Sequence, residues 1–426
     1  MSQLMKQFSI SFLVLAAASC TSEPITKSWV FVSKAPSVST PLVTQDRIFF
    51  GSDVGLDAIN RLGGFVWRLD RQGMNVVGGP AAYEDIVLFG STNSQFYAAS
   101  YDGRMVWEYT AGARIKSDAL TDGDSVIFSS YDGHVYKMAV EDKKMQWIFP
   151  SEAAEELPGP PTHPKVKAYI AAMADYSKKV AECAAQAEAA QAEGKAPEQP
   201  CEPGDAPAAP SSEQGAEWEW PPADFAYSSP MRVGNLIILG NMDWNVYALN
   251  ADTGELVWRT RLNGTVTSSA VAGDGVIYIG SNGRLGGKSP EDGRLYALDA
   301  KTGKILNNFQ AKNEVNSSVR LDGDSLYFGD VAGNMYCLDA KTLKEKWSFK
   351  TNGPIRGRPA IYKNLVFIGS GAGDNQMYAL RQDDGKVFWK YKTGGKIESD
   401  PVISGDELFF TSHDRRLYAF KIRKTP

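Results

Sequence analysis

Side chains that could carry catalytic or metal chemistry are scarce in this sequence. Its 426 residues include only three histidines, and histidine is the usual acid–base catalyst and metal ligand near neutral pH. The four cysteines, Cys20, Cys183, Cys201 and Cys337, are the other reactive side chains, and no two of them are adjacent. We therefore expect no catalytic, cofactor-binding or metal-binding residues, and we expect cysteine to serve attachment and cross-linking.

Cys20 follows a short apolar segment at the N-terminus. The stretch from Phe8 to Ala18 is too short to span a membrane and is typical of a secretory signal peptide. The small residues Ala17, Ala18 and Ser19 before the cysteine resemble a lipoprotein signal, which implies lipidation of Cys20 and an outer-membrane anchor on the periplasmic side. The alternative is an ordinary signal-peptidase site that leaves Cys20 unmodified.

Cys183 and Cys201 lie in an acidic segment, residues 150–226. Residues 151–226 have a net charge of −9, whereas the whole chain has −5, so the remainder is about +4. Residues 164–194 are alanine-rich with apolar side chains at helical spacing, and a Pro/Ala/Glu tract follows. An exported chain in an oxidising compartment favours a disulfide between Cys183 and Cys201, and two free thiols are the alternative. The overall negative charge argues against nucleic acid as a partner.

A repeat organises the rest of the chain. The stretch "VYALNADTGELVW" (246–258) recurs as "FYAASYDGRMVW" (96–107), "MYCLDAKTLKEKW" (335–347) and "MYALRQDDGKVFW" (377–389), with looser copies elsewhere. A period near 40 residues indicates a solenoid or a propeller. Each unit contains four short apolar runs separated by hairpin turns, which is the pattern of one propeller blade.

Eight copies of the second run predict an all-β, eight-bladed β-propeller with four antiparallel strands per blade. The last blade lacks a fourth strand, and we expect the N-terminal strand that starts at Trp29 to complete it and close the ring. The predicted organisation is a lipoprotein signal peptide (1–19), a lipidated tether (20–28), blades one to three with the closing strand (29–149), the acidic helical insertion (150–226) and blades four to eight (227–426).

One tryptophan per blade has the position of a docking residue on the outer strand. We expect each indole ring to pack against the next blade. Removal of one ring should lower the free energy of unfolding by about 3–5 kcal/mol. Asn307 replaces the tryptophan in blade five and Leu343 replaces the turn glycine in blade six. This predicts that blade five docks its neighbour least tightly. The expected docking residues are Trp29, Trp67, Trp107, Trp147, Trp258, Trp347 and Trp389.

The repeat resembles the PQQ-like propeller repeat over nearly all of residues 29–426 outside the acidic insertion. That family includes quinone-dependent dehydrogenases. For a member with that activity, the resemblance implies an adjacent cysteine pair and a calcium site. Neither is recognisable here, and Cys337 replaces the alanine of "YALDA" as a small buried residue. With its blade number and lipoprotein signal, the chain resembles the BamB family of the outer-membrane β-barrel assembly machinery. That resemblance implies a non-enzymatic scaffold for protein partners, a monomer within a complex.

Strand parity places the irregular parts of the chain on one face. Second-to-third-strand hairpins and blade-to-blade connections share a face, which we call the hairpin face. The opposite side, which carries the third-to-fourth-strand turns, is the turn face. The insertion, the tip with Trp244 and the loop 282–293 should all lie on the hairpin face, and the tether should attach at the turn face.

Candidate partner-binding residues follow from that geometry. Trp218, Trp220 and Trp244 are outside the repeat and are either packing positions for the insertion or anchors for a partner. Arg356 and Arg358 lie near the channel mouth, as a solvated rim or as part of a partner site. Three functions stay open: a BamB-like outer-membrane scaffold, a periplasmic propeller that binds another envelope partner or a cell-wall polymer, and a PQQ-dependent dehydrogenase.

Overall fold

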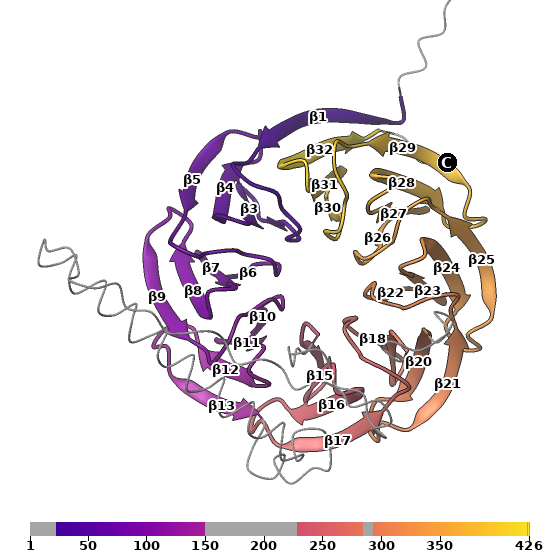
Figure 1. Cartoon of the computed structure of the whole chain (residues 1–426), viewed down its shortest axis with the longest axis horizontal. Coiled ribbons are helices and arrows are strands. Elements are labelled where there is room, and N and C mark those ends of the chain that lie inside the picture. Colours follow the sequence, from indigo (N-terminus) through magenta and orange to yellow (C-terminus); the bar gives the residue numbers. More distant parts are fainter. Residues whose placement is uncertain (1–22, 150–227, 284–292, 424, 426) are drawn as a thin grey trace, which may run out of the picture.

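A computed structural model describes residues 23–149, 228–283, 293–423 and 425 of the chain. These residues form eight four-stranded antiparallel sheets arranged radially around a central axis (Figure 1). The prediction of an all-β, eight-bladed propeller is confirmed. The predicted helix and disulfide of the insertion lie outside the described residues, as do Cys20, Cys183, Cys201, Trp218 and Trp220.

The first four blades have their strands in sequence order from the axis outward. Their bounds are β2 (Leu42–Val43), β3 (Arg47–Ser52), β4 (Gly55–Asn60) and β5 (Phe65–Leu69) in blade one, β6 (Ala81–Tyr83), β7 (Ile86–Gly90), β8 (Gln95–Ser100) and β9 (Met105–Thr110) in blade two, β10 (Leu120–Asp122), β11 (Ser125–Ser129), β12 (Val135–Ala139) and β13 (Met145–Phe149) in blade three, and β14 (Met231–Val233), β15 (Leu236–Gly240), β16 (Asn245–Asn250) and β17 (Leu256–Arg261) in blade four.

The remaining four blades follow the same plan, except that the last one is completed from the other end of the chain. Their bounds are β18 (Val271–Gly273), β19 (Val276–Ser281), β20 (Arg294–Asp299) and β21 (Ile305–Gln310) in blade five, β22 (Arg320–Asp322), β23 (Ser325–Gly329), β24 (Asn334–Asp339) and β25 (Glu345–Lys350) in blade six, β26 (Ala360–Tyr362), β27 (Leu365–Gly369), β28 (Gln376–Arg381) and β29 (Val387–Lys392) in blade seven, and β30 (Val402–Ser404), β31 (Glu407–Ser412), β32 (Arg416–Ile422) and β1 (Ile25–Val32) in blade eight.

The N-terminal strand β1 closes the ring as the outer strand of blade eight (Figure 1). It pairs antiparallel with β32 from Ile25, opposite Ile422, to Val32, opposite Arg416. The strand begins four residues before the predicted start at Trp29. Ile25 is fully buried in the core between blades seven and eight, so burial extends the pairing, and an irregularity between Lys27 and Trp29 absorbs the difference in register. Only Thr21 to Pro24 then separate Cys20 from the strand.

The sequence of each run explains its place in a blade. Second and third strands such as β7 and β8 are short apolar runs whose residues are mostly buried, because both faces of the sheet are covered by neighbouring blades. Outer strands are more exposed, and β9 changes between half-buried and exposed at every residue. One face of β9 therefore contacts water and the other contacts the core.

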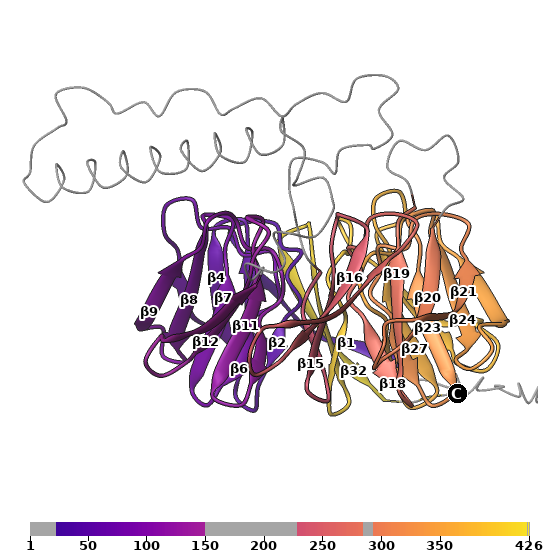
Figure 2. The same cartoon turned by 90° about the horizontal axis from the view of Figure 1, so that it is seen from below.

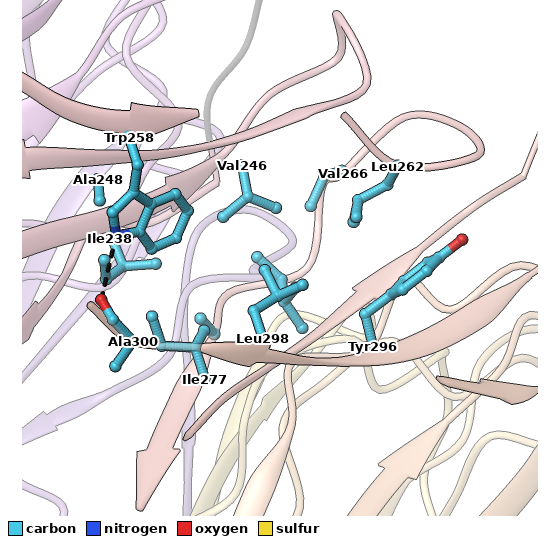
Figure 3. Close-up of a cluster of buried hydrophobic side chains, with 12 residues drawn as sticks. Ile238, Val246, Ala248, Trp258, Leu262, Val266, Ile277, Tyr296, Leu298 and Ala300 are labelled. Atoms are coloured by element: carbon cyan, nitrogen blue, oxygen red, sulfur yellow. Dashed lines mark hydrogen bonds between the residues drawn. The ribbon is translucent and has the colours of Figure 1, made fainter. Parts of the chain in front are cut away.

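The core is divided among the eight joints between neighbouring blades. The cluster between blades four and five shows the arrangement (Figure 3): Trp258 of β17 lies over Ala300, with Ile238 of β15 and Ile277 of β19 at the same end of the cluster. Each blade thus contributes one face to each of two clusters.

The propeller has two distinct faces, above and below the blades in Figure 2. Within the ranges that the structure describes, no helix has the length and hydropathy of a membrane span. The first strands line the central channel, and the ends of the two gaps at 150–227 and 284–292 lie on the hairpin face.

Candidate functional site

The repeat tryptophans connect neighbouring blades through their indole nitrogens. Trp258 donates its Nε1–H to the backbone oxygen of Ala300 in the next blade, at 3.1 Å (Figure 3). Five others make the same bond: Trp29 to Arg61, Trp67 to Tyr101, Trp107 to Val140, Trp147 to Ala251 and Trp347 to Gln382. Trp389 contacts Phe420 of blade eight edge-on, with ring centroids 5.1 Å apart. The aromatic part of the repeat therefore serves the joints between blades.

The turn glycine of the repeat is the surface on which the preceding blade's tryptophan rests. Gly254 has a φ of +75°, and a Cβ on it would lie 2.7 Å from the ring of Trp147. Gly303 has the same relation to Trp258, at 2.5 Å. A side chain at either position would displace the ring. The glycine of one blade therefore leaves room for the tryptophan of the preceding blade.

The joint between blades five and six uses a different set of residues. Leu343, in place of the glycine, is buried at 4% exposure and keeps a positive φ of 55°. Asn307, in place of the tryptophan, donates its side-chain amide to the backbone oxygen of Thr342. The Tyr278 hydroxyl donates to Ala340, the oxygen that an indole would use. Asn307 and Leu343 thus take the places of the tryptophan and the glycine at this joint, and the expectation that blade five docks its neighbour least tightly stays a prediction.

A buried tyrosine–aspartate bond fixes most hairpins of the hairpin face. The Tyr378 hydroxyl donates to Asp374 at 2.8 Å, and Tyr136 donates to Asp132 at 2.6 Å. Burial and the nearby carboxylate raise the pKa of both tyrosines well above its usual range. The same bond joins Tyr247 to Asp243, Tyr336 to Asp330 and Tyr418 to Asp414. These aspartates are therefore structural acceptors.

The hairpin of blade four keeps this bond and has Trp244 at its tip. The same position has a positive φ in other blades, where it is Gly133, Gly333 or a non-glycine residue such as Arg415, and the φ of 74° at Trp244 is a left-handed conformation that a bulky side chain adopts only with strain. Its ring is half-buried, and the guanidinium of Arg261 lies over it at 5.0 Å. An aromatic side chain held in a strained conformation on the predicted face is a candidate contact residue.

A second stack of the same kind lies on blade three. Arg114 and Lys116, both in the connection from blade two, lie over the ring of Tyr131 at 4.9 and 5.0 Å. Blades three and four therefore present two aromatic rings with three cations on one face.

Of the two arginines predicted at the channel mouth, Arg356 has an ion-pair partner and Arg358 bonds through its backbone. Arg356 forms an ion pair with Glu398 at 3.3 Å, and Lys396 and His413 also contact that carboxylate, at 3.0 and 3.2 Å. Burial and the charge of Lys396 lower the pKa of His413. The Arg358 backbone amide donates to Asp400 at 2.7 Å. Both arginines thus belong to a mixed-charge channel wall.

Asp400 is the most perturbed carboxylate of that wall. Burial raises its pKa to about 6; Asp118, across the channel, adds to the rise, and Arg358 opposes it. The Asp118 side chain accepts from the amide of Gly79, and the Asp400 amide donates to Thr40, at 2.5 and 3.2 Å. These bonds join blade to blade around the channel, which gives the carboxylates a structural role.

Buried charge replaces a repeat residue at two joints. In blade one, Asp57 replaces the repeat tyrosine, is fully buried, and pairs with Arg68 of the same blade at 2.6 Å, while it accepts from Ser33, which follows the closing strand, at 2.6 Å. At the joint beside the insertion, Lys137 replaces the repeat alanine and bonds to Asp122 and Ala251. The Ser33 and Ala251 bonds connect these charged residues to the neighbouring blade.

The remaining candidates for a catalytic or metal centre are the histidine, cysteine and acidic side chains of the described residues. Within the described ranges, no group of three or more histidine, cysteine or acidic side chains is placed to hold a metal ion. Cys337, the cysteine inside the propeller, is 1% exposed in the joint between blades six and seven, and burial raises the pKa of its thiol. It does not face the channel and has no neighbouring cysteine in sequence.

Sequence reasoning identified Trp244 but missed its surroundings. Arg261 and the Tyr131 stack depend on contacts between hairpins and connections that no linear pattern records. Asp57 could have been found, because it interrupts a tyrosine that seven other repeats keep at the same position. The partner of that aspartate, Arg68, becomes evident only in the folded blade.

Comparison with known proteins agrees with this architecture. A family model described as outer membrane protein assembly factor BamB matches residues 52–198, 213–306, 291–395 and 366–425. A quinohemoprotein alcohol dehydrogenase, ADH IIB of Pseudomonas putida, is 32% identical over 136 residues, 30% of this chain and 20% of that enzyme. The BamB protein of Burkholderia pseudomallei is 23% identical over 145 residues, 34% of this chain and 35% of that protein.

The likeness to solved structures concerns the fold. The BamB structure from Moraxella catarrhalis superposes with a TM-score of 0.64 at 14% identity, over 94% of this chain and 99% of that one. The matched part spans about a fifth to a third of the sequence relatives named above. With the eight blades and the extent of the family match, the chain belongs to the propeller family described as outer membrane protein assembly factor BamB.

Proposed function

We propose that this protein is a non-enzymatic scaffold of the outer membrane, anchored through Cys20 on the periplasmic side, that supports β-barrel assembly by binding protein partners. The observation that carries the proposal is Trp244, an aromatic ring kept at a strained φ of 74° on the hairpin face beneath Arg261. Tryptophan and arginine are the residue types most enriched among the contacts that dominate binding energy. A partner would insert beside this ring.

The distribution of polar groups supports a binding role for the hairpin face. The channel wall directs its charged groups at each other, as Arg356 does with Glu398, and the recurring hairpin aspartates bind tyrosines within their own blades. The Trp244 and Tyr131 stacks instead place aromatic surface at the rim of the ring. Because strand pairing between β1 and β32 closes the ring, these side chains are held on rigid elements, which lowers the entropy cost of binding.

Affinity capture from solubilised outer membranes tests this proposal. The full chain should retain identified subunits of the β-barrel assembly machinery, and a Cys20→Ser variant should appear in the soluble periplasmic fraction. Recovery of the protein without any such subunit, or association with a cell-wall polymer in their place, would overturn the assignment in favour of another envelope partner.

A second candidate, a quinone-dependent dehydrogenase, is favoured by the 32% identity to ADH IIB. The described residues fit that chemistry poorly, since Cys337 lies between blades and away from the channel. Titration of the purified chain with PQQ and calcium, followed by absorbance, separates the candidates. We expect no saturable spectral change, and a stoichiometric one would contradict a purely structural role.

A further inference from the structure

The hairpin face of blades three and four concentrates positive charge on aromatic rings. We call Arg114, Lys116, Tyr131, Trp244 and Arg261 the aromatic–basic patch. Its cations lie 4.9 to 5.0 Å from the ring centroids, and Arg261 is exposed while the other four are half-buried. A cation stacked on a ring retains its charge.

Acidic side chains beside the patch are engaged within their own blades. Asp132 accepts from the Tyr136 hydroxyl and from the amide of Gly112, at 2.6 and 2.7 Å, and only 13% of its side chain is exposed. Asp243 accepts from the Tyr247 hydroxyl and from the Asn245 amide. Both carboxylates therefore have hydrogen-bond donors of their own in the hairpins and connections of blades three and four.

The most acidic segment of the chain begins and ends beside this patch. Residues 151–226 have a net charge of −9, against about +4 for the rest of the chain. The preceding residue range ends with Phe149 of β13, whose ring contacts Tyr247 of blade four at 5.6 Å. The following range begins at Ser228, whose amide donates to Gly240 at 2.7 Å. Both ends are therefore fixed at the joint between blades three and four.

We propose that residues 151–226 of this same chain bind the aromatic–basic patch through their carboxylates. Attachment at both ends keeps the effective concentration of the segment in the millimolar range, so weak pairwise contacts suffice. Opposite charge gives the contact its affinity and makes it dependent on salt. The inference deepens the proposed function and rests on it in one respect: because the patch contains Trp244, the segment would compete there with an acidic region of a partner.

A photo-cross-linking amino acid at position 131 of the full-length chain tests this contact. Peptide mapping should place most intramolecular products within 151–226. The charge-reversal variant R114E/K116E/R261E should reduce them at least threefold at low salt, as should 0.5 M salt in the unchanged chain. The matched control is K301E/K304E/K341E, which reverses three exposed lysines near the turn face and should leave the yield unchanged.

Circular dichroism and thermal unfolding establish first that both variants are folded. The proposal is wrong if the yield within 151–226 is the same in both variants and at both salt concentrations, or if products form mainly with another copy of the chain. This readout uses the purified monomer alone. Its result therefore does not depend on whether assembly-machinery subunits are captured from membranes.

Discussion

At the scale of single residues, the paired departures at the joint between blades five and six make a double-mutant prediction. Asn307→Trp alone should destabilise the fold, because the new ring would occupy the space of Leu343, which is 4% exposed. Leu343→Gly alone should cost about 1–3 kcal/mol, the loss of a buried leucine partly offset by relief of its positive φ.

The double variant N307W/L343G restores the glycine–tryptophan pair of the other joints and should recover most of that loss. Urea denaturation of the three variants gives the coupling free energy, which we expect to exceed about 1 kcal/mol in the stabilising direction. Additive effects would show that Leu343 and residue 307 do not share one site.

Asp400 makes a prediction about pH at the same scale. Its folded pKa of about 6 lies above the ordinary value of 3.8, so the folded state holds the proton more tightly than the unfolded state. Ionisation of Asp400 therefore costs stability as pH rises from 4 to 6, and the loss is complete above that range. Asp400→Asn should stabilise the protein by about 1–2 kcal/mol at pH 8, after allowance for partial solvent screening, and should have little effect at pH 4.

Urea unfolding at the two pH values measures this difference. The amide oxygen of the asparagine still accepts from the Arg358 backbone, so the hydrogen bond is kept. Asp46→Asn removes a carboxylate whose side chain is 66% exposed and serves as the control. A stabilisation equal at pH 4 and pH 8 would show that burial of Asp400 does not perturb its ionisation.

At the scale of elements, the closing strand depends on the buried pair between Asp57 and Arg68. Arg68→Ala should cost about 3–5 kcal/mol, because it leaves the fully buried Asp57 with Ser33 as its hydroxyl donor but without a countercharge. Hydrogen exchange should accelerate first in β1 and β32, the strands next to that joint.

Arg71→Ala is the matched control for the loss of an arginine. Arg71 pairs with Glu108 at 2.7 Å with both side chains close to half-exposed, and such pairs contribute under about 1 kcal/mol. If the two variants lost equal stability, or if exchange rose evenly over all blades, the closure joint would have no special role for β1.

The same elements show which parts of the fold can be predicted from the sequence. Hairpin turns and apolar runs predict every blade, because strand period and turn chemistry are local properties. The start of β1 at Ile25 was missed because its burial depends on residues almost 400 positions away, such as Ile422. The hydrogen bond of Tyr278 at the joint of blades five and six was missed for the same reason.

At the scale of the whole molecule, the contacts that stabilise the ring and the side chains proposed to bind a partner lie in different places. Tryptophans and channel contacts hold blade to blade, and tyrosine–aspartate bonds fix the hairpins within each blade. The hairpin face of blades three and four carries the stacked cations and rings. Trp244 could be picked from sequence as a tryptophan outside the repeat, whereas its strain and its stack on Arg261 needed the folded hairpin. A residue kept at a cost in stability indicates selection for another purpose.

The most direct test of the account compares Trp244→Gly with the unchanged chain for binding to the proposed partner, the purified periplasmic domains of the barrel subunit of the β-barrel assembly machinery from the same organism. Glycine suits the φ of 74°, so the variant should unfold within about 1 kcal/mol of the unchanged chain, or above it. We predict at least a tenfold weaker affinity, whereas Leu62→Ala, which alters a side chain 85% exposed at a third-to-fourth-strand turn, should bind normally. Equal affinity of the Trp244→Gly variant and the unchanged chain would contradict the account.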